Sequence, residues 1–445
     1  MAAGWHAVFF PFPAQGHVAP ALRLAKLLHV LGGVRITFVH TERNLRRLIR
    51  SGGPATVAAA PGFRFVTVPD GLPPPLSDED EDDHSPQHIA ALLLSLEASV
   101  PRLRNHLDDA AADGEQLSNG YLTNTEIDWM PGMPENMRLR DMPSFIRTTD
   151  PDDAVLRAVV STMDCYHPAV LSAVILNTFD ELEGKVVAAM SDVLVPHIYT
   201  VGPLPLLSES ASAGGSGGAA SLLKEDKGCL EWLGSKRPGS VVYANFGSIA
   251  VLTSQQLVEF AWGLANSGYD FLAVIRNDQA KKSTAAALPP EFVTRGRGET
   301  TKERRGYVAS WCPQGEVLRH EAVGMFLTHC GWNSMLESIA SGVPMLCWPV
   351  GGDQQTNCRF ACTEWGVGME LAGDGAVLRD QVEAQVKEVM GGERGREMRR
   401  RAAEWKVSAA AAALPLPDCG GTSWVNFNKL VNQVFSPRKD AHWQN

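Results

Sequence analysis

Short apolar runs separated by helical stretches recur along the second half of the chain. Six such runs stand between residues 240 and 371, and each is short enough for one strand: SVVYANFG, YDFLAVI, GYVASW, VGMFLTH, VPMLCWP and VGMEL. Strands and helices in regular alternation are typical of a parallel sheet whose faces are covered by helices. The second half is therefore expected to form such a sheet.

One of the intervening helices has clear start and stop signals. In TSQQLVEFAWGLANSG, Thr253 and Gln256 have the spacing of a capping box, in which each side chain bonds the backbone N–H of the other. Gly268 follows as a residue that tolerates the left-handed conformation at a helix end. The pattern predicts a helix between these signals.

The first half has the same rhythm, and a flexible stretch separates the halves. Its apolar runs are AVFFPF, RITFVHT, FRFVTV, AVILNTF and HIYTVGP, and SESASAGGSGGAAS has the composition of a linker. We expect an α/β protein with two Rossmann-like domains that face each other across a cleft. The predicted parts are an N-terminal domain, a linker, a C-terminal domain and a last helix with its tail that packs back towards the N-terminal domain: residues 1–205, 206–222, 223–424 and 425–445.

One region of the first half lacks this rhythm. After a helical stretch that ends in RNHLDD, residues 110–153 contain turn residues and prolines but no convincing strand. A long stretch without secondary structure is uncommon inside a compact domain. Something is therefore unusual in this part of the chain.

The composition limits the class of protein. A chain of 445 residues is too long for one hydrophobic core, which favours two domains. Hydrophobic residues make up 44% and charged residues 20%, as in soluble globular proteins. The net charge of −10 argues against a nucleic-acid surface, which needs clustered Lys and Arg. Because no apolar run could cross a bilayer and no signal peptide is recognisable, we expect a cytoplasmic protein without membrane insertion.

The cysteines indicate a reducing compartment. Eight of them are scattered along the chain without the spacing of a metal site. Cys312, Cys330 and Cys347 stand in strongly apolar surroundings, where a free thiol packs as a small hydrophobic group. Reduced thiols are therefore expected rather than a disulfide framework.

A turn between a buried strand and a helix is the main candidate for a binding site. In VGMFLTHCGWNSMLESIASGVPMLCWP the strand ends at His329, the chain turns at Gly331, and a helix begins near Asn333. The free N–H groups and positive dipole end of such a helix suit a phosphate at the carboxyl edge of a parallel sheet.

Polar side chains at the same place would complete this site. His329, Asn333 and Ser334 would donate hydrogen bonds to the same anion. Glu337 follows about one helical turn after Asn333 and would accept hydrogen bonds from sugar hydroxyls. Alternatively, Asn333 or Ser334 only caps the helix, which is the commoner role of such residues.

The segment from Trp311 to Gln354 resembles the complete signature box of plant secondary-product UDP-glycosyltransferases, which are inverting enzymes of the GT-B fold. It reads WCPQGEVLRHEAVGMFLTHCGWNSMLESIASGVPMLCWPVGGDQ without a gap. The resemblance extends through FPFPAQGHVAPALRLAKLL, VPDGLPP, IDWMPGM, VILNTFDELE, VYANFGS and GREMRRRAAEWK, and so covers nearly the whole chain. It implies an acceptor-binding N-terminal domain and a UDP-sugar-binding C-terminal domain.

The resemblance also implies roles for single residues. The implied groups are, for the uridine, Trp311, Cys312, Gln314 and Glu337; for the diphosphate, Ser248, His329, Asn333 and Ser334; and for the sugar, Trp332, Asp353 and Gln354. Trp311 would stack on uracil, and Glu337 would bind the ribose hydroxyls. The Gln at the end of the box implies a preference for glucose over galactose. Each motif match is a hypothesis, since Trp311 could be an ordinary aromatic residue at a strand end, and Asp353 and Gln354 plain loop residues.

A single histidine, His17, follows the first predicted strand in PFPAQGHVAP. Deprotonation of an acceptor hydroxyl needs a base with a pKa near neutrality, and histidine is the side chain with such a pKa. A lone histidine is usually only a solvated polar residue. The resemblance of this motif implies instead that His17 is the catalytic base of an inverting transfer.

The family's partner for this histidine is an aspartate on a VVADG-like strand, which orients the imidazole and stabilises its charged form. No such strand is present, and the shortening falls near residues 114–115. Asp113 resembles the missing residue only superficially, because no apolar strand precedes it, while Asp108 and Asp109 look like exposed helix-end charges. We therefore expect an N-terminal domain that lacks one or two strands, has exposed sheet edges and orients His17 poorly.

Other signals point elsewhere and are weaker. Asp78 and Asp80 have the spacing of metal ligands, but they belong to an acidic run for which a solvated loop is the better interpretation. No strand is followed by GxGxxG, which argues against a nicotinamide or flavin dehydrogenase. The basic run RGREMRRRAAEWK is expected to be an exposed helix face.

Two hypotheses about function remain. The first is a UDP-glucosyltransferase that acts on a hydroxyl of a small hydrophobic acceptor, of the specialised-metabolite or hormone class. The second is a shortened, inactive or weakly active relative that binds UDP-sugar without efficient transfer. The expected partners are UDP-glucose and a small acceptor, the expected state is a monomer, and the resemblance implies neither a cofactor nor a metal ion.

Overall fold

The computed structural model describes residues 5–58, 60–69, 125–127, 129–147, 156–157, 172–193, 197–211, 221–276, 289, 305–371, 377–416 and 420–435. The chain forms two compact units. The first comprises Met1–Asp70, Tyr166–Leu222 and Ser408–Asn445, and the second comprises Gly71–Cys165 and Leu223–Val407. The domain boundaries expected from the sequence stay a prediction, because compactness does not tell which segments fold on their own.

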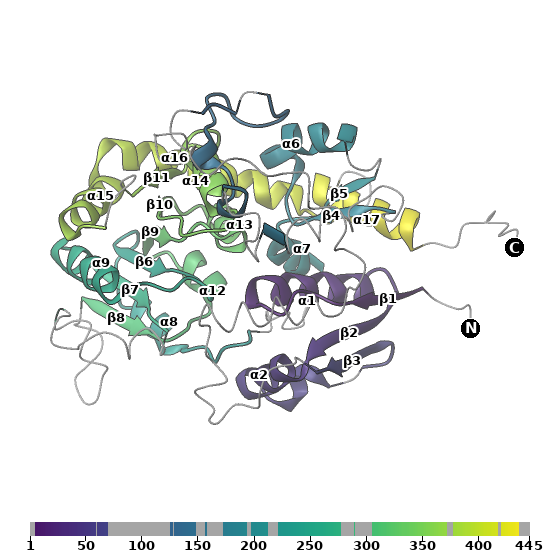
Figure 1. Ribbon diagram of the computed structural model, residues 1–445. Coiled ribbons are helices and arrows are strands. Elements are labelled where there is room, and N and C mark those ends of the chain that lie inside the picture. The colour runs from purple at the N-terminus through teal and green to yellow at the C-terminus, as the bar shows by residue number, and fades with distance from the viewer. Residues whose placement is uncertain are drawn as a thin grey trace, which may run out of the picture. The chain divides into compact units, whose positions relative to one another are not determined.

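A six-stranded parallel sheet is the centre of the second unit (Figure 1). Its strands are β6 (Val241–Asn245), β7 (Asp270–Val274), β8 (Gly306–Ala309), β9 (Val323–Thr328), β10 (Met345–Cys347) and β11 (Gly368–Glu370). Each of the six apolar runs contains one of these strands, which confirms the predicted sheet. The order is β11-β10-β9-β6-β7-β8, so the chain runs outward from β6 to β8 and then returns to β9. Ligands commonly bind at the carboxyl ends of strands beside such a switch point.

Helices cover both faces of this sheet. α9 (Ser254–Asn266) and α15 (Arg379–Gly391) pack against each other on one face, and α12 (Gln314–Arg319) and α13 (Trp332–Ser341) do so on the other (Figure 1). The main core lies between the sheet and α9 and α15, and its buried side chains include Phe260, Leu327 and Val382. Further described elements of this unit are α8 (Gly228–Leu233), α14 (Gln354–Cys362), the 3-10 helices η3 (Leu139–Asp141) and η4 (Ser144–Ile146), and α16 (Glu393–Ala412), which continues into the first unit.

The predicted capping box is present at the start of α9. Gln256 N–H donates to the Thr253 hydroxyl at 3.1 Å, and Thr253 N–H donates to Gln256 Oε1 at 2.9 Å. The helix ends at Asn266, and Gly268 follows with a φ of +85°, where a side chain would be strained. Both signals read from the sequence are therefore confirmed.

The first unit contains two small parallel sheets. One consists of β1 (His6–Phe9), β2 (Arg35–Thr41) and β3 (Phe63–Val68), and the other of β4 (Val174–Leu176) and β5 (Ile198–Thr200). Each of these five strands overlaps one of the five apolar runs of the first half, as predicted. The helices described in this unit are α1 (Gln15–Val30), α2 (Glu42–Gly52), η1 (Pro54–Val57), α6 (Asp180–Val193), α7 (Leu204–Ala211) and α17 (Thr422–Val434). Leu22 of α1, Leu204 of α7 and Phe427 of α17 share one core.

No described strand joins the two sheets of the first unit. β1 pairs with β2 and β4 with β5, and neither has a described partner on its other side. Val8 and Phe10, in and just after β1, are 62% and 60% exposed. The expected loss of strands stays a prediction, because the stretch that carries Asp78, Asp80, Asp108, Asp109 and Asp113 lies outside the described residues. Among the helices that the structure describes, none is long and apolar enough to cross a membrane.

Candidate functional site

Turns at one edge of the six-stranded sheet carry several of the residues singled out from the sequence. Ser248 stands shortly after β6, Trp311 after β8, and His329 directly after β9. These strands are parallel, so their carboxyl ends lie at the same edge. These residues of the expected site therefore all lie at the carboxyl ends of the strands.

Helix α13 begins at this edge without a capping side chain. Gly331 is its N-cap residue, no side-chain cap hydrogen bond is formed there, and no acidic residue stands in the first turn. The alternative in which Asn333 or Ser334 caps the helix is wrong, because Gly331 is the N-cap residue and the helix begins at Trp332, near the expected start. The helix N-terminus thus offers its N–H groups and the positive end of its dipole to an anion.

The ring of His329 lies against two glycines. A Cβ atom at Gly247 or Gly331 would come within 2.4 or 2.5 Å of His329 Nε2, so no larger residue fits at either place. Burial lowers the pKa of His329 to about 4, although a backbone hydrogen bond at Asn245 opposes this shift, and the charge of Arg276 adds to it. The imidazole is therefore neutral at neutral pH and able to donate a hydrogen bond to an anion.

Gln314 connects α12 with α13 and with the end of β6. Its Nε2 donates to Ser334 Oγ at 3.0 Å and to Glu337 Oε2 at 2.9 Å. Its Oε1 accepts from Asn245 Nδ2 at 2.8 Å and from the Tyr243 hydroxyl at 3.1 Å. The amide therefore sets the positions of Ser334 and Glu337, two of the expected site residues.

Trp311 and Cys312 are adjacent but differ in exposure. Trp311 is half-buried, and its carbonyl accepts from Asp226 N–H at 2.9 Å. Cys312 is buried, with its Sγ 3.3 Å from the Tyr243 hydroxyl. Hydrogen bonding with Cys229 and burial raise the pKa of the Cys312 thiol, so it is neutral at neutral pH. The thiol therefore belongs to the buried layer beneath the site.

Asp353 and Gln354 stand at the start of α14, as N-cap and first helical residue. Gln354 Oε1 accepts from the N–H groups of Val350 and Gly351 at 2.9 and 3.1 Å. Asp353 is exposed, and its Oδ2 accepts from Asn357 Nδ2 at 3.0 Å. Both side chains therefore hydrogen-bond within the loop and the start of the helix, and their role in sugar binding stays a prediction.

A contact that the sequence did not predict holds the same loop. Ser144 N–H donates to the Gly352 carbonyl, and Gly352 N–H donates to Ser144 Oγ, both at 2.8 Å. Nearby, the Thr356 hydroxyl donates to the Asp141 carbonyl at 2.8 Å. Since Ser144 and Gly352 are 208 residues apart in the chain, no local pattern could reveal this contact.

His17 lies in the first unit, in the first turn of α1. Its side chain is exposed, and its ring meets the Phe12 ring edge-on with 5.2 Å between the centroids. The aspartates considered as its partner lie outside the described residues, so the expected lack of a carboxylate partner for His17 stays a prediction.

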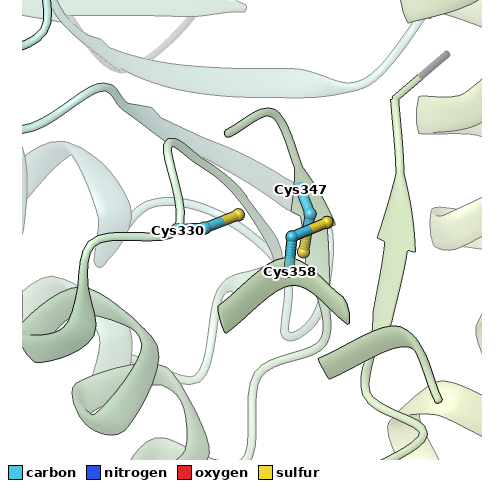
Figure 2. Close-up of side chains that lie close together, drawn as sticks. All are labelled: Cys330, Cys347 and Cys358. Carbon is cyan, nitrogen blue, oxygen red and sulfur yellow. The ribbon is translucent and has the colours of Figure 1, made fainter. Parts of the chain in front are cut away.

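Three thiols lie together where the β9–α13 turn, β10 and α14 meet. The sulfur atoms of Cys330, Cys347 and Cys358 are all within 4.8 Å of one another (Figure 2). By distance, three sulfur atoms so close can hold a thiophilic metal ion, which their spacing along the chain does not predict. However, all three are buried, burial raises the pKa of Cys330, and hydrogen bonding with Cys330 raises that of Cys347. We therefore interpret the group as neutral thiols that pack the core.

Comparison with known proteins adds to this geometry. A family model described as UDP-glucoronosyl and UDP-glucosyl transferase matches residues 159–400. The chain is 45% identical to 7-deoxyloganetin glucosyltransferase of Gardenia jasminoides, with 97% of this chain and 98% of the relative covered. It is 44% identical to (R)-mandelonitrile beta-glucosyltransferase of Prunus dulcis, with the same shares covered.

A solved structure has the same fold. Os79 from O. sativa in complex with UDP superimposes with a TM-score of 0.71 at 25% identity, and the match covers 96% of this chain and 99% of that one. The alignment with the Gardenia relative runs over 492 positions, although this chain has only 445 residues. The alignment must therefore contain gaps, and that relative has residues that this chain lacks.

Proposed function

The chain belongs to the plant UDP-glycosyltransferase family, and from this membership we propose that it transfers glucose from UDP-glucose to a hydroxyl group of a small hydrophobic acceptor. Its α/β fold is the GT-B fold of these enzymes. The Gardenia and Prunus relatives are named for glucosyl transfer to 7-deoxyloganetin and (R)-mandelonitrile, which supports an acceptor of the specialised-metabolite or hormone class.

The group of side chains at the start of α13 carries this proposal. A nucleoside diphosphate needs donors for its phosphates and acceptors for its ribose hydroxyls. We assign the phosphates to the N–H groups of α13, the neutral His329, Asn333, Ser334 and Ser248. The Ser334 hydroxyl already accepts from Gln314, so its own proton is available to a phosphate oxygen.

The remaining parts of UDP-glucose fit the neighbouring residues. We assign the ribose hydroxyls to Glu337, whose carboxylate Gln314 holds in place, and the uracil ring to the half-buried Trp311. The glucose hydroxyls go to Asp353, Gln354 and Trp332. Gln354 Oε1 already accepts from two backbone N–H groups, so we assign the hydrogen bond to the sugar to its amide nitrogen.

We assign the acceptor step to His17. Its imidazole takes the proton of the acceptor hydroxyl while that oxygen attacks the anomeric carbon, and the bond from this carbon to the diphosphate oxygen breaks. UDP leaves with the electron pair, and the α13 N-terminus stabilises its charge. A single displacement of this kind inverts the anomeric centre, and neither a cofactor nor a metal ion takes part.

We propose the cytoplasm as the place of this reaction and a monomer as the working state. The six cysteines in the described part of the chain are all free thiols, which supports a reducing compartment.

One observation favours a second candidate function, a shortened relative that binds UDP-sugar without efficient transfer. The additional residues of the relative favour a shortened chain, and the sequence predicts the loss near residues 114–115, where the resemblance implies the strand of the catalytic aspartate. Without a carboxylate partner His17 would have a poorer tautomer balance and a less stable charged form. In this case the donor half would still bind UDP.

An assay of glucoside formation separates the two candidates. Purified protein is incubated with UDP-glucose and a mixed panel of phenolic and terpenoid alcohols, beside His17→Ala and the control His29→Ala, a histidine of the same helix. We expect glucosides from the wild type and the control, and a rate lower by about 10²- to 10⁴-fold for His17→Ala.

Calorimetric titration with UDP completes the test. Binding of UDP by the wild type without any glucoside would reject the transferase and leave the second candidate. A folded sample that binds no UDP would reject the donor site around His329 and Glu337, and both candidates with it.

A further inference from the structure

A buried amide beneath the proposed donor site uses all of its polar atoms. Asn245, at the end of β6, is 4% exposed. Its Oδ1 accepts from Gly247 N–H at 2.9 Å. Its Nδ2 donates to Gln314 Oε1 at 2.8 Å and to the Tyr243 hydroxyl at 2.9 Å. The side chain therefore ties together β6, the turn after it, and α12.

The direction of these bonds follows from the chemistry of the partners. An ionised carboxylate only accepts, so Gln314 must turn its Nε2 towards Glu337 and its Oε1 towards Asn245. Asn245 must then present its Nδ2 to Gln314, which leaves its Oδ1 for Gly247 N–H. Reversal of either amide would bring two acceptors face to face. An asparagine in this orientation satisfies both neighbours at once.

These neighbours belong to different parts of the proposed site. Gln314 donates to the carboxylate of Glu337, which is assigned to the ribose. Gly247 lies against His329, which is assigned to the diphosphate. The two are so close that a Cβ atom on the glycine would clash with the ring. Arg276, 5% exposed, holds the same turn by donating from its Nη1 to the Gly247 carbonyl at 2.8 Å.

We infer that Asn245 is a positioning residue for the donor nucleotide. It holds the Glu337 carboxylate, assigned to the ribose, and the Gly247 turn beside His329, assigned to the diphosphate, at fixed positions relative to each other. The inference rests on the function proposed above. Asn245 acts through Gln314 and Gly247, and it has no contact with the reacting atoms in this scheme.

The substitution Asn245→Asp tests this role with almost no change of shape. One carboxylate oxygen still accepts from Gly247 N–H, while the other replaces Nδ2 and repels Gln314 Oε1. At neutral pH we expect UDP to bind about ten- to a hundredfold more weakly than to the wild type, as measured by calorimetry. Uridine should also bind more weakly, because the substitution disturbs Gln314 and with it Glu337, which is assigned to the ribose and does not depend on the phosphates.

The pH dependence provides a readout that a merely structural role would not give. A protonated carboxyl group has an O–H that replaces the lost Nδ2 donor. The UDP affinity of Asn245→Asp, relative to the wild type at the same pH, should therefore recover as the pH is lowered. Asn245→Ala has no such group and should not recover.

Val242→Ala is the matched control, since Val242 is buried in the same strand but faces the main core. It should lower the unfolding temperature and leave UDP affinity unchanged. Equal loss of UDP affinity in Val242→Ala and Asn245→Asp would overturn the inference. If Asn245→Asp does not fold, Asn245→Ser takes its place, because a serine can reach Gly247 N–H but is too short for Gln314, and about tenfold weaker UDP binding is expected.

The outcomes also separate this inference from the proposed function. UDP binding by the wild type with unchanged affinity in the folded Asn245 variants would overturn the positioning role and leave the function standing. Failure of the folded wild type to bind UDP would overturn both.

Discussion

His40 is a histidine whose surroundings disfavour its charge. It is 2% exposed, its ring centroid lies 4.8 Å from that of Phe38 and 5.7 Å from that of Phe65, and neither ring nitrogen has a hydrogen-bond partner within the described part of the chain. Burial lowers its pKa from 6.5 to about 4. The folded protein therefore keeps this imidazole neutral at pH values at which the unfolded chain already binds a proton.

This residue makes stability depend on pH in a defined window. Above pH 6.5 both states are neutral, and between pH 6.5 and about 4 only the unfolded state gains the proton, so stability falls as the pH falls. We expect His40→Gln to lose about 2 kcal/mol less unfolding free energy than the wild type between pH 7 and pH 5. Denaturant unfolding at both pH values measures the difference. Equal losses in the two proteins would contradict the assigned shift.

At the scale of elements, the short helix η4 is attached to the loop before α14. The backbone and hydroxyl of Ser144 form a reciprocal pair with Gly352, directly before the residues assigned to the sugar. The nucleotide part of the site is formed by other elements, α12, α13 and the turn after β6. A change in η4 should therefore affect the sugar more than the nucleotide.

Ser144→Ala removes one hydrogen bond of this pair. We expect the KM for UDP-glucose to rise about three- to tenfold, because a single hydrogen bond contributes about 0.5–1.5 kcal/mol, while the affinity for UDP stays unchanged. Steady-state kinetics and UDP titration measure the two quantities. Ser191→Ala, which removes a hydroxyl bonded within α6, should alter neither. A parallel loss of UDP affinity in Ser144→Ala would show that the loop does not act on the sugar alone.

At the scale of the whole molecule, the edge of β1 in the first unit bears on how the protein behaves at high concentration. β1 has exposed apolar side chains on a strand whose second edge has no described partner. Strand edges of this kind pair readily with other chains, and a lysine on the edge opposes such pairing. Because the sequence predicts an N-terminal domain that lacks one or two strands and has exposed sheet edges, we expect self-association through β1 at high protein concentration.

We expect the Val8→Lys protein to scatter less light than the wild type during storage or heating. Its unfolding free energy should lie within about 0.5 kcal/mol of the wild-type value. Val30→Lys is the matched control, because Val30 is 70% exposed but stands at the end of helix α1, where no strand edge is available. Light scattering and thermal unfolding are the measurements. Equal benefit from both substitutions would point to net charge rather than to the strand edge.

Local patterns predicted much of this protein because the forces behind them act over a few residues. The apolar runs located every described strand, Thr253 and Gln256 located a helix start, and the signature box drew attention to His329, Gln314 and Glu337. The start of α13 near Asn333 is confirmed, whereas the N-cap residue Gly331 was not predicted, because a glycine has no side chain that would mark a cap.

The sequence by itself determined the strands, the parallel α/β organisation and the family, because hydrophobic periodicity, caps and a contiguous motif are all local. Only the tertiary structure decided that Asn245 bonds both Gln314 and Gly247, that Ser144 meets Gly352, and that the sulfur atoms of Cys330, Cys347 and Cys358 lie together. The Asn245–Gln314 and Ser144–Gly352 contacts join residues that are 69 and 208 positions apart in the chain. Which residues meet there depends on how the sheet and its helices pack, and not on the neighbours of either residue in the sequence.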